Sequence, residues 1–184
     1  MKKKSVMVAS HDLMRTLSHS MDWMRWKAAI DQCPECADLD DLVKSVYLMA
    51  QFERASWLSL KSINSIVDIG GRASLALRLL GYYGHLAVVN PNKDTYHSLQ
   101  AVEAGFDEII IDDQPDREYD LLIDLDCGAF DIRTITSSAC WMFFNGDLRD
   151  YEKEVSDAGL ITMMSKSILD PSWNFIVGIG LADE

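Results

Sequence analysis

Short apolar runs, each followed by polar residues or glycine, recur along the chain from residue 65 onward. Runs of this length bounded by turn residues are typical of buried strands. They predict strands at residues 65–69, 86–89, 109–111, 119–123 and 141–144. Helix-like stretches follow the first two of these strands. The order strand, helix, strand, helix favours an α/β protein with a mostly parallel sheet.

The residues before Leu60 have helical rather than strand periodicity. Two apolar stripes follow steps of three and four residues: Met14, Leu17, Met21, Met24 and Ala28 on one face, and Trp23, Trp26 and Ile30 on another. A second helix is predicted from a stripe of its own, which consists of Leu39, Leu42, Val43, Val46 and Ala50. We expect one face of the first helix to pack on the second helix and the other face on the sheet. A lid or a subunit contact is the alternative, because methionine and tryptophan are frequent at adaptable binding surfaces. The pattern divides the chain into a helical extension, residues 1–61, and an α/β domain, residues 62–184.

A glycine turn separates the first predicted strand from the helix that follows it. The turn contains Gly70 and Gly71, two residues after Asp68. Glycine lets the backbone turn tightly and approach a ligand, and the next helix presents free N–H groups. A dinucleotide fingerprint spaces its glycines as G-x-G-x-x-G, whereas here Arg72 and Ser74 occupy positions where small residues are usual. The turn therefore indicates a nucleotide-type ligand site of unusual composition.

Polar residues also follow the other predicted strands. They are Asn90 and Asn92 after the second strand, Asp112 and Asp113 after the third, Asp124 and Asp126 after the fourth, and Asn145 and Asp147 after the fifth. In an open α/β sheet, ligands bind beyond the carboxyl ends of the strands, so we expect these endings to converge on one crevice. For Asp112 and Asp113 the alternative is that they only keep an exposed turn solvated.

Four segments give the chain a resemblance to a known family. They are V-D-I-G at 67–70, V-V-N-P-N at 88–92, D-L-L-I-D-L-D-C-G-A-F-D at 120–131, and W-N-F-I-V at 173–177. In these segments the chain resembles the FkbM-type class I S-adenosylmethionine-dependent methyltransferases. The resemblance implies a Rossmann-like class I methyltransferase sandwich with a mostly parallel sheet. It also implies that residues 160–164 and 174–179 form a terminal hairpin, which places one antiparallel strand in the sheet.

The resemblance further implies O-methyl transfer from S-adenosylmethionine to a small molecule or a saccharide. It assigns the cofactor contacts to Asp68, Gly70, Gly71, Ser74, Asn90, Asp112 and Asp113. Family members usually have a glycine in place of Ser74 and an acidic residue in place of Asn90. A carboxylate accepts hydrogen bonds from both ribose hydroxyls of the cofactor, which an amide does less well. Arg72 is a bulky cation that can fill cofactor space or repel the sulfonium charge. These departures favour a second interpretation, a catalytically inactive domain that serves as a protein-binding or scaffolding subunit.

Asp124 and Asp126 are the candidate catalytic residues. Methyl transfer depends chiefly on alignment, and it needs a base only where an acceptor hydroxyl must lose its proton. Either carboxylate can be that base. For Asp126 the alternative is a capping role, because a carboxylate is favoured before a helix that starts near Ala129. Two acids can hold Mg²⁺, as in some related O-methyltransferases, but they are too few ligands to predict a metal site.

The charge balance narrows the expected partners. The 184 residues carry a formal net charge of −12, so a nucleic-acid phosphate backbone is not an expected partner. The expected partners are the small-molecule or saccharide acceptor, and a protein or a second copy of the chain at the N-terminal helices. No apolar run approaches the ~18 residues of a membrane span, and the default location is the cytoplasm.

Cys33 and Cys36 are the two cysteines with a short spacing. We interpret them as part of a helix–helix connection, in which Pro34 ends one helix and Asp38 caps the next. A zinc site would need two more ligands nearby, and a redox role is the remaining alternative.

Overall fold

The structure is a computed structural model that describes residues 23–56, 59–111, 119–125, 140–144, 160–166 and 174–180. The helices are α2 (Trp23–Asp31), α3 (Leu39–Ser56), η1 (Leu60–Ser62), α4 (Ser74–Leu79) and α5 (Lys93–Ala101). The strands are β1 (Ser65–Ile69), β2 (His85–Val89), β3 (Glu108–Ile110), β4 (Leu121–Asp124), β5 (Cys140–Phe144), β6 (Leu160–Lys166) and β7 (Asn174–Gly180).

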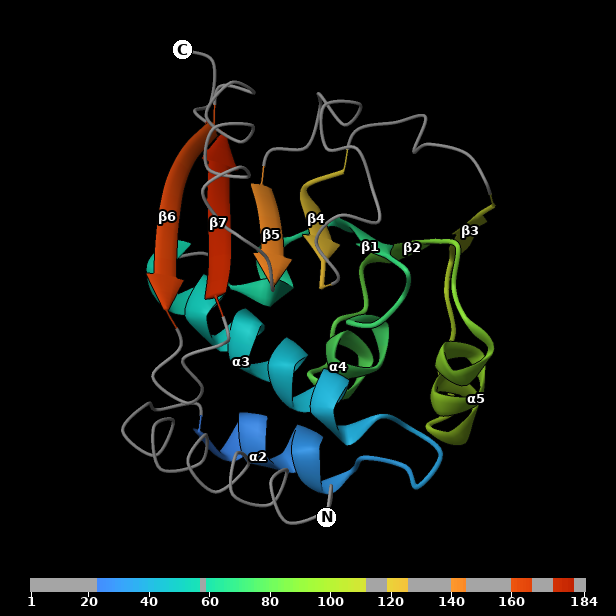
Figure 1. The fold of residues 1–184 in the computed structure, drawn as a ribbon. Coiled ribbons are helices and arrows are strands. Elements are labelled where there is room, and N and C mark those ends of the chain that lie inside the picture. The colour runs from blue at the N-terminus through green and yellow to red at the C-terminus, as the bar shows by residue number, and fades with distance from the viewer. Residues whose placement is uncertain are drawn as a thin grey trace.

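The strands form one sheet in the order β3-β2-β1-β4-β5-β7-β6 (Figure 1). Strands β1 to β5 pair in parallel, whereas β7 runs antiparallel to both β5 and β6. The predicted α/β sandwich with a mostly parallel sheet is therefore confirmed, and so is the terminal hairpin with its single antiparallel strand. Strands β1, β2 and β4 are buried along nearly their whole length, as expected for central parallel strands, which are covered on both faces.

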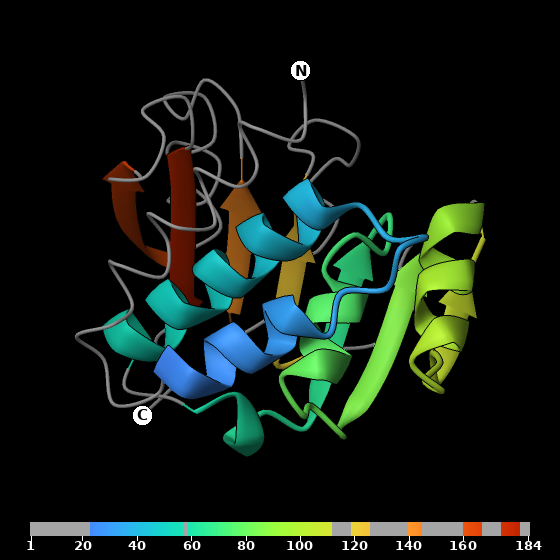
Figure 2. The same cartoon turned by 90° about the horizontal axis from the view of Figure 1, so that it is seen from below.

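Helix α3 lies between α2 and the sheet (Figures 1 and 2). Its residues from Ser45 to Ala50 are all buried, and one hydrophobic core joins α3 to β1, β2 and β4. On α2, Trp26 belongs to this core, but Met24 is 59% exposed and Ala28 is exposed as well. The expected packing of both faces of the first helix is therefore wrong at Met24 and Ala28, and the other members of that stripe, Met14, Leu17 and Met21, lie outside the described residues. The second helix is the one with two buried faces, because it is the longer helix and its middle is apolar or small on all sides.

The connection between α2 and α3 has the predicted form. It contains Cys33, which is half-buried, and Cys36, which is exposed. The Oδ1 atom of Asp38 accepts hydrogen bonds from the backbone N–H groups of Asp40 at 2.8 Å and Asp41 at 3.4 Å, so Asp38 caps α3 as expected.

An ion pair holds α2 against α3 at the other end of the helix pair. The Arg25 Nη1 atom lies 3.0 Å from a carboxylate oxygen of Glu53, and Arg25 Nε donates to the Leu80 carbonyl at 3.4 Å, after α4. The two helices are thus tied to the α/β part of the molecule by polar contacts as well as by the core. The proposed boundary between residues 1–61 and 62–184 stays a prediction. Within the described residues, no helix is both long enough and apolar enough to cross a membrane.

Candidate functional site

The strand register brings three of the predicted polar endings to one edge of the sheet. Ile69 at the end of β1 lies opposite Val89 of β2 on one side and opposite Asp124 of β4 on the other. Gly70 and Asn90, the next residues of β1 and β2, are therefore level with the end of β4. The convergence expected from the sequence holds for these endings. Asp112, Asp113 and Asp126, and the residues after β5, lie outside the described residues.

The two glycines of the turn differ in what surrounds them. Both have left-handed backbones, with φ of +75° at Gly70 and +77° at Gly71. A Cβ added at Gly70 would meet no described residue within 4 Å, whereas one at Gly71 would lie 2.9 Å from Val88 Cγ1 and 3.0 Å from Thr95 Cγ2. Gly71 thus lets the turn pack on β2 and α5, and at Gly70 no described residue covers the Cβ direction.

Ser74 forms a hydrogen bond that the sequence comparison with the family did not anticipate. Its hydroxyl donates to Oδ2 of Asp68 at 2.6 Å, and both side chains are fully buried. The Oδ1 atom of Asp68 has no hydrogen-bond partner among the residues that the structure describes. Burial raises the pKa of Asp68 to about 7, against the opposing effect of hydrogen bonds from Ser74 and from the Ala73 backbone. The residue in the usual glycine position therefore stabilises a buried carboxyl group behind the turn.

Asn90 also has a left-handed backbone, with φ of 48°. Asparagine is one of the few residues other than glycine that adopts this conformation readily. Its N–H donates to the Ile110 carbonyl at 2.8 Å, which ties the end of β2 to β3, and the residue is exposed. An amide at the end of β2 is thus accessible to a ligand at this edge of the sheet.

Asp124 is 1% exposed at the carboxyl end of β4. It lies near enough to Asp68 for its negative charge to add to the rise in the Asp68 pKa, as the smallest of several causes. Two buried carboxyl groups therefore lie in adjacent central strands, Asp124 as the last residue of β4 and Asp68 one residue before the end of β1. No cluster of three or more metal-ligating side chains occurs in the part of the chain that the structure describes.

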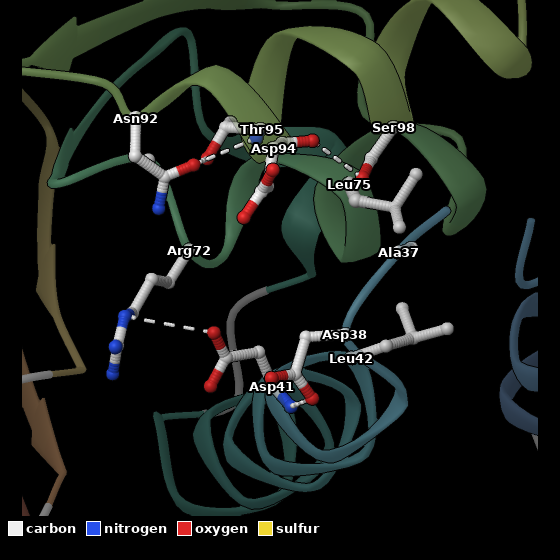
Figure 3. Close-up of a pocket in the computed structure, with 11 residues that line it drawn as sticks. Ala37, Asp38, Asp41, Leu42, Arg72, Leu75, Asn92, Asp94, Thr95 and Ser98 are labelled. Atoms are coloured by element: carbon white, nitrogen blue, oxygen red, sulfur yellow. Dashed lines mark hydrogen bonds and ion pairs between the residues drawn. The ribbon is translucent and has the colours of Figure 1, made fainter. Parts of the chain in front are cut away.

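Arg72 forms an ion pair with Asp41 on the first turn of α3. Its Nε atom lies 3.5 Å from Asp41 Oδ2. The two side chains meet at a cavity of about 160 Å³ between the glycine turn, α3 and the start of α5 (Figure 3). Burial raises the pKa of Asp41, and the Arg72 charge opposes that rise. On the α5 side of the cavity, Asn92 caps the helix by accepting from the Thr95 backbone N–H at 2.8 Å.

Sequence reasoning identified Arg72 as unusual but did not find Asp41. Acidic residues are common in the first turn of a helix because the helix dipole stabilises a negative charge there. The sequence therefore gave no sign that Asp41 had a further contact. The contact between α3 and the glycine turn arises only from tertiary packing.

No family model matches the chain, and no curated protein matches it. Solved structures do resemble it. Magnesium protoporphyrin IX methyltransferase (ChlM) from Synechocystis PCC 6803 with bound SAH has a TM-score of 0.54 at 14% identity, over 93% of this chain and 100% of that chain. The METTL16 MTase domain has a TM-score of 0.56 at 10% identity, over 80% of this chain and 73% of that chain. The tRNA (uracil-54, C5)-methyltransferase of Pyrococcus abyssi, in complex with S-adenosyl-L-homocysteine, has a TM-score of 0.52 at 9% identity, over 74% of this chain and 38% of that chain.

These identities are low, so the likeness concerns the fold. The fold of this chain is that of the class I S-adenosylmethionine-dependent methyltransferases, with a Rossmann-like sheet. The narrower resemblance to the FkbM type stays a prediction.

Proposed function

We propose that the chain binds S-adenosylmethionine over the carboxyl ends of β1, β2 and β4 and transfers its methyl group to an oxygen atom of a small molecule or a saccharide. The observation that carries this proposal is the turn at Gly70. The turn combines a left-handed backbone with a Cβ direction that no described residue occupies, at the edge of the sheet where three strand endings meet. A ligand can approach such a backbone more closely than it could approach any side chain.

The residues at this edge suit the groups of that cofactor. Its ribose hydroxyls and its ammonium group are hydrogen-bond donors. The exposed amide of Asn90 offers an acceptor at the end of β2, and one carboxylate oxygen of Asp68, behind the turn, accepts no hydrogen bond from any described residue. The turn itself offers backbone groups at Gly70. We therefore assign Gly70, Asn90 and Asp68 to the cofactor side of the site.

Bound S-adenosylmethionine supplies a methyl group on a sulfonium centre that a nucleophilic oxygen can displace. The protein's part is to hold donor and acceptor in line, to exclude water and to receive the hydroxyl proton. We assign the last role to Asp124, which ends β4 next to the glycine turn, and keep Asp126 as the second candidate on the grounds of the sequence.

One observation favours the alternative, a catalytically inactive binding or scaffolding subunit. The two residues that replace small ones in the glycine turn are already engaged by protein groups, Arg72 by Asp41 and Ser74 by Asp68. An ion pair to α3 and a hydrogen bond to β1 can stabilise the fold in a protein that binds no ligand at this turn.

Calorimetric titration with S-adenosylmethionine and with S-adenosylhomocysteine separates the two functions. We expect micromolar binding of both, with NAD as a control ligand that does not bind. A ligand at 100 times its dissociation constant should stabilise the fold by ~2.7 kcal/mol, which a thermal denaturation curve detects. No heat and no thermal shift at millimolar cofactor would refute the proposal and favour the scaffold. Where binding is found, formation of S-adenosylhomocysteine with panels of hydroxylated small molecules and saccharides tests the transfer.

A further inference from the structure

A hydrogen bond between two buried side chains closes the glycine turn. Asp68 belongs to β1 and Ser74 begins α4, and the Ser74 hydroxyl donates to Asp68 Oδ2 at 2.6 Å. Neither residue has any exposed surface. The turn between them, residues 69–73, includes Gly70. Since consecutive Cα atoms are about 3.8 Å apart, the Cα atoms of Asp68 and Gly70 lie within roughly 8 Å of each other. The Asp68 carboxyl group is therefore held just behind the backbone that the proposed cofactor approaches.

The hydrogen bonds to Asp68 all come from the start of α4. Besides the Ser74 hydroxyl, the backbone N–H groups of Ala73 and Ser74 donate to this carboxyl group. Its Oδ1 atom accepts no hydrogen bond from any described residue. Donors stabilise the charged form of a carboxyl group, whereas burial destabilises it. The two effects leave the pKa of Asp68 at about 7, so the Ser74 hydroxyl helps to decide whether Asp68 is ionised at neutral pH.

The other charges around Asp68 leave that balance in place. On β4, Asp124 raises the pKa of Asp68 as the smallest of its causes, and on β2 the uncharged Val88 lies opposite Asp68 in the sheet. The described charged side chains of the turn, α3 and α4 all belong to ion pairs: Arg72 with Asp41, Lys44 with Asp40, Glu53 with Arg25, and Arg78 with Asp107. Ionisation of Asp68 therefore adds a negative charge behind the turn that no described cation pairs with.

We propose that Ser74 is a positioning residue, whose hydroxyl fixes Asp68 as a carboxylate behind the glycine turn and so favours the positively charged S-adenosylmethionine over its neutral thioether product. This inference rests on the proposed function. The sulfonium centre adds a positive charge that S-adenosylhomocysteine lacks, and a negative charge close by attracts it. Members of the family that the chain resembles usually have glycine in place of Ser74, which has no hydroxyl to supply this bond.

The test is the ratio of the affinities for S-adenosylmethionine and S-adenosylhomocysteine as a function of pH, measured by calorimetric titration. In the wild type we expect the preference for S-adenosylmethionine to grow roughly fivefold as the pH rises through about 7 and Asp68 ionises. Asp68→Asn should show no such rise. The α-amino groups of both ligands titrate near about pH 8, and because this contribution remains in Asp68→Asn it can be subtracted.

Three substitutions of Ser74 separate the hydroxyl from the rest of the side chain. Ser74→Ala and Ser74→Gly remove the hydrogen bond, which raises the pKa of Asp68 further. The rise in preference should therefore move to higher pH, and at pH 7 both variants should prefer S-adenosylmethionine less than the wild type does. Ser74→Thr keeps the hydroxyl and should keep the wild-type profile. A merely structural role of Ser74 would lower both affinities together and leave the profile where it is.

Ser45→Ala is the matched control. Ser45 is also fully buried, but its hydroxyl donates to the Asp41 backbone carbonyl at 2.7 Å within α3. We expect its pH profile to equal that of the wild type. Thermal denaturation without ligand establishes the conditions under which each variant is folded, and the titrations are made there.

The outcomes distinguish this inference from the proposed function. Binding of both ligands by the wild type, with the same pH profile in Ser74→Ala and Ser74→Gly, refutes the role of Ser74 and leaves the cofactor site standing. A profile in Asp68→Asn equal to that of the wild type, or an equal shift in Ser45→Ala, also refutes it. Failure of the wild type to bind either ligand refutes the proposed function and this inference with it.

Discussion

The two adjacent glycines offer a direct test of where the ligand lies. We predict that Gly71→Ala loses more stability than Gly70→Ala, whereas Gly70→Ala loses more ligand affinity. Both positions have nearly the same left-handed φ, +75° and +77°, so alanine suffers the same backbone strain at each. That strain amounts to about 1–2 kcal/mol for an L-residue. Any further difference between the two variants must come from what the new methyl group meets.

The structure sets the size of that difference. At Gly71 the new methyl group would lie 2.9 Å from Val88 Cγ1 and 3.0 Å from Thr95 Cγ2, and both neighbours are buried. Forcing an extra methyl into a packed region costs typically 1–3 kcal/mol. We therefore expect the free energy of unfolding to fall by about 1–2 kcal/mol in Gly70→Ala and by about 2–5 kcal/mol in Gly71→Ala.

Binding should follow the reverse order. The methyl group at Gly70 would meet none of the described residues at the strand ends, where the proposed cofactor must approach the backbone. We expect Gly70→Ala to lower cofactor affinity by about tenfold or more, equivalent to at least ~1.4 kcal/mol. In Gly71→Ala the methyl group points toward β2 and α5, so the folded fraction should keep its affinity.

Urea unfolding measures the stabilities, and calorimetric titration with S-adenosylhomocysteine measures the affinities. Titrations are made where both variants are folded, which the unfolding curves establish. Unchanged affinity in Gly70→Ala would show that no ligand approaches that backbone, and our placement of the site would be wrong. Equal losses of stability in the two variants would show instead that Val88 and Thr95 can move to accommodate the methyl group with no loss of unfolding free energy.

Two further predictions concern the polar groups of the site. Asp68 has a pKa of about 7 in the folded protein, whereas its ordinary value is 3.8. The fold therefore loses stability as the pH rises from about 4 to about 7, because the unfolded chain gives up this proton more readily, and the loss is complete above that range. Relative to Asp68→Asn, the wild type should therefore lose thermal stability as the pH is raised from about 5 to about 8, and parallel curves would contradict the shifted pKa. Asn90→Asp should tighten cofactor binding by up to about tenfold, because a charged acceptor forms stronger hydrogen bonds with the ribose hydroxyls. Aspartate is preferred to glutamate for this test, since φ is 48° at this position and aspartate tolerates the left-handed region better; unchanged affinity in calorimetry would place the ribose elsewhere.

The central strands could be predicted from the sequence with little error. β1 has the predicted bounds, and β2 begins one residue earlier than predicted. Buried parallel strands are apolar on both faces, so they appear as continuous runs ended by turn residues. For the same reason the polar endings at Gly70, Asn90 and Asp124 could be placed at one edge without any knowledge of side-chain contacts.

Contacts between distant elements could not be predicted. Ser74 stood out only as a departure from a glycine, because nothing in the local pattern shows that its hydroxyl reaches Asp68 across the turn. The stacking order of α2 and α3 was also misjudged. Both helices have apolar stripes, and periodicity reports how many faces are apolar but not which neighbour covers each face. Burial of the middle of α3 from Ser45 to Ala50 decides the order in the structure.

The position of α3 bears on how the site can work. A lid must open and close, so it is drawn from segments with few buried contacts. Helix α3 has the opposite character, because its middle is buried between α2 and the sheet and shares one core with β1, β2 and β4. Moving it would expose residues such as Leu48 and Met49, which have no exposed surface in the structure. Its first turn, with Asp41, is therefore a fixed wall of the cavity beside the glycine turn. A fixed wall keeps Asp41 within ion-pair distance of Arg72, so this side of the cavity needs no reorganisation when a ligand binds.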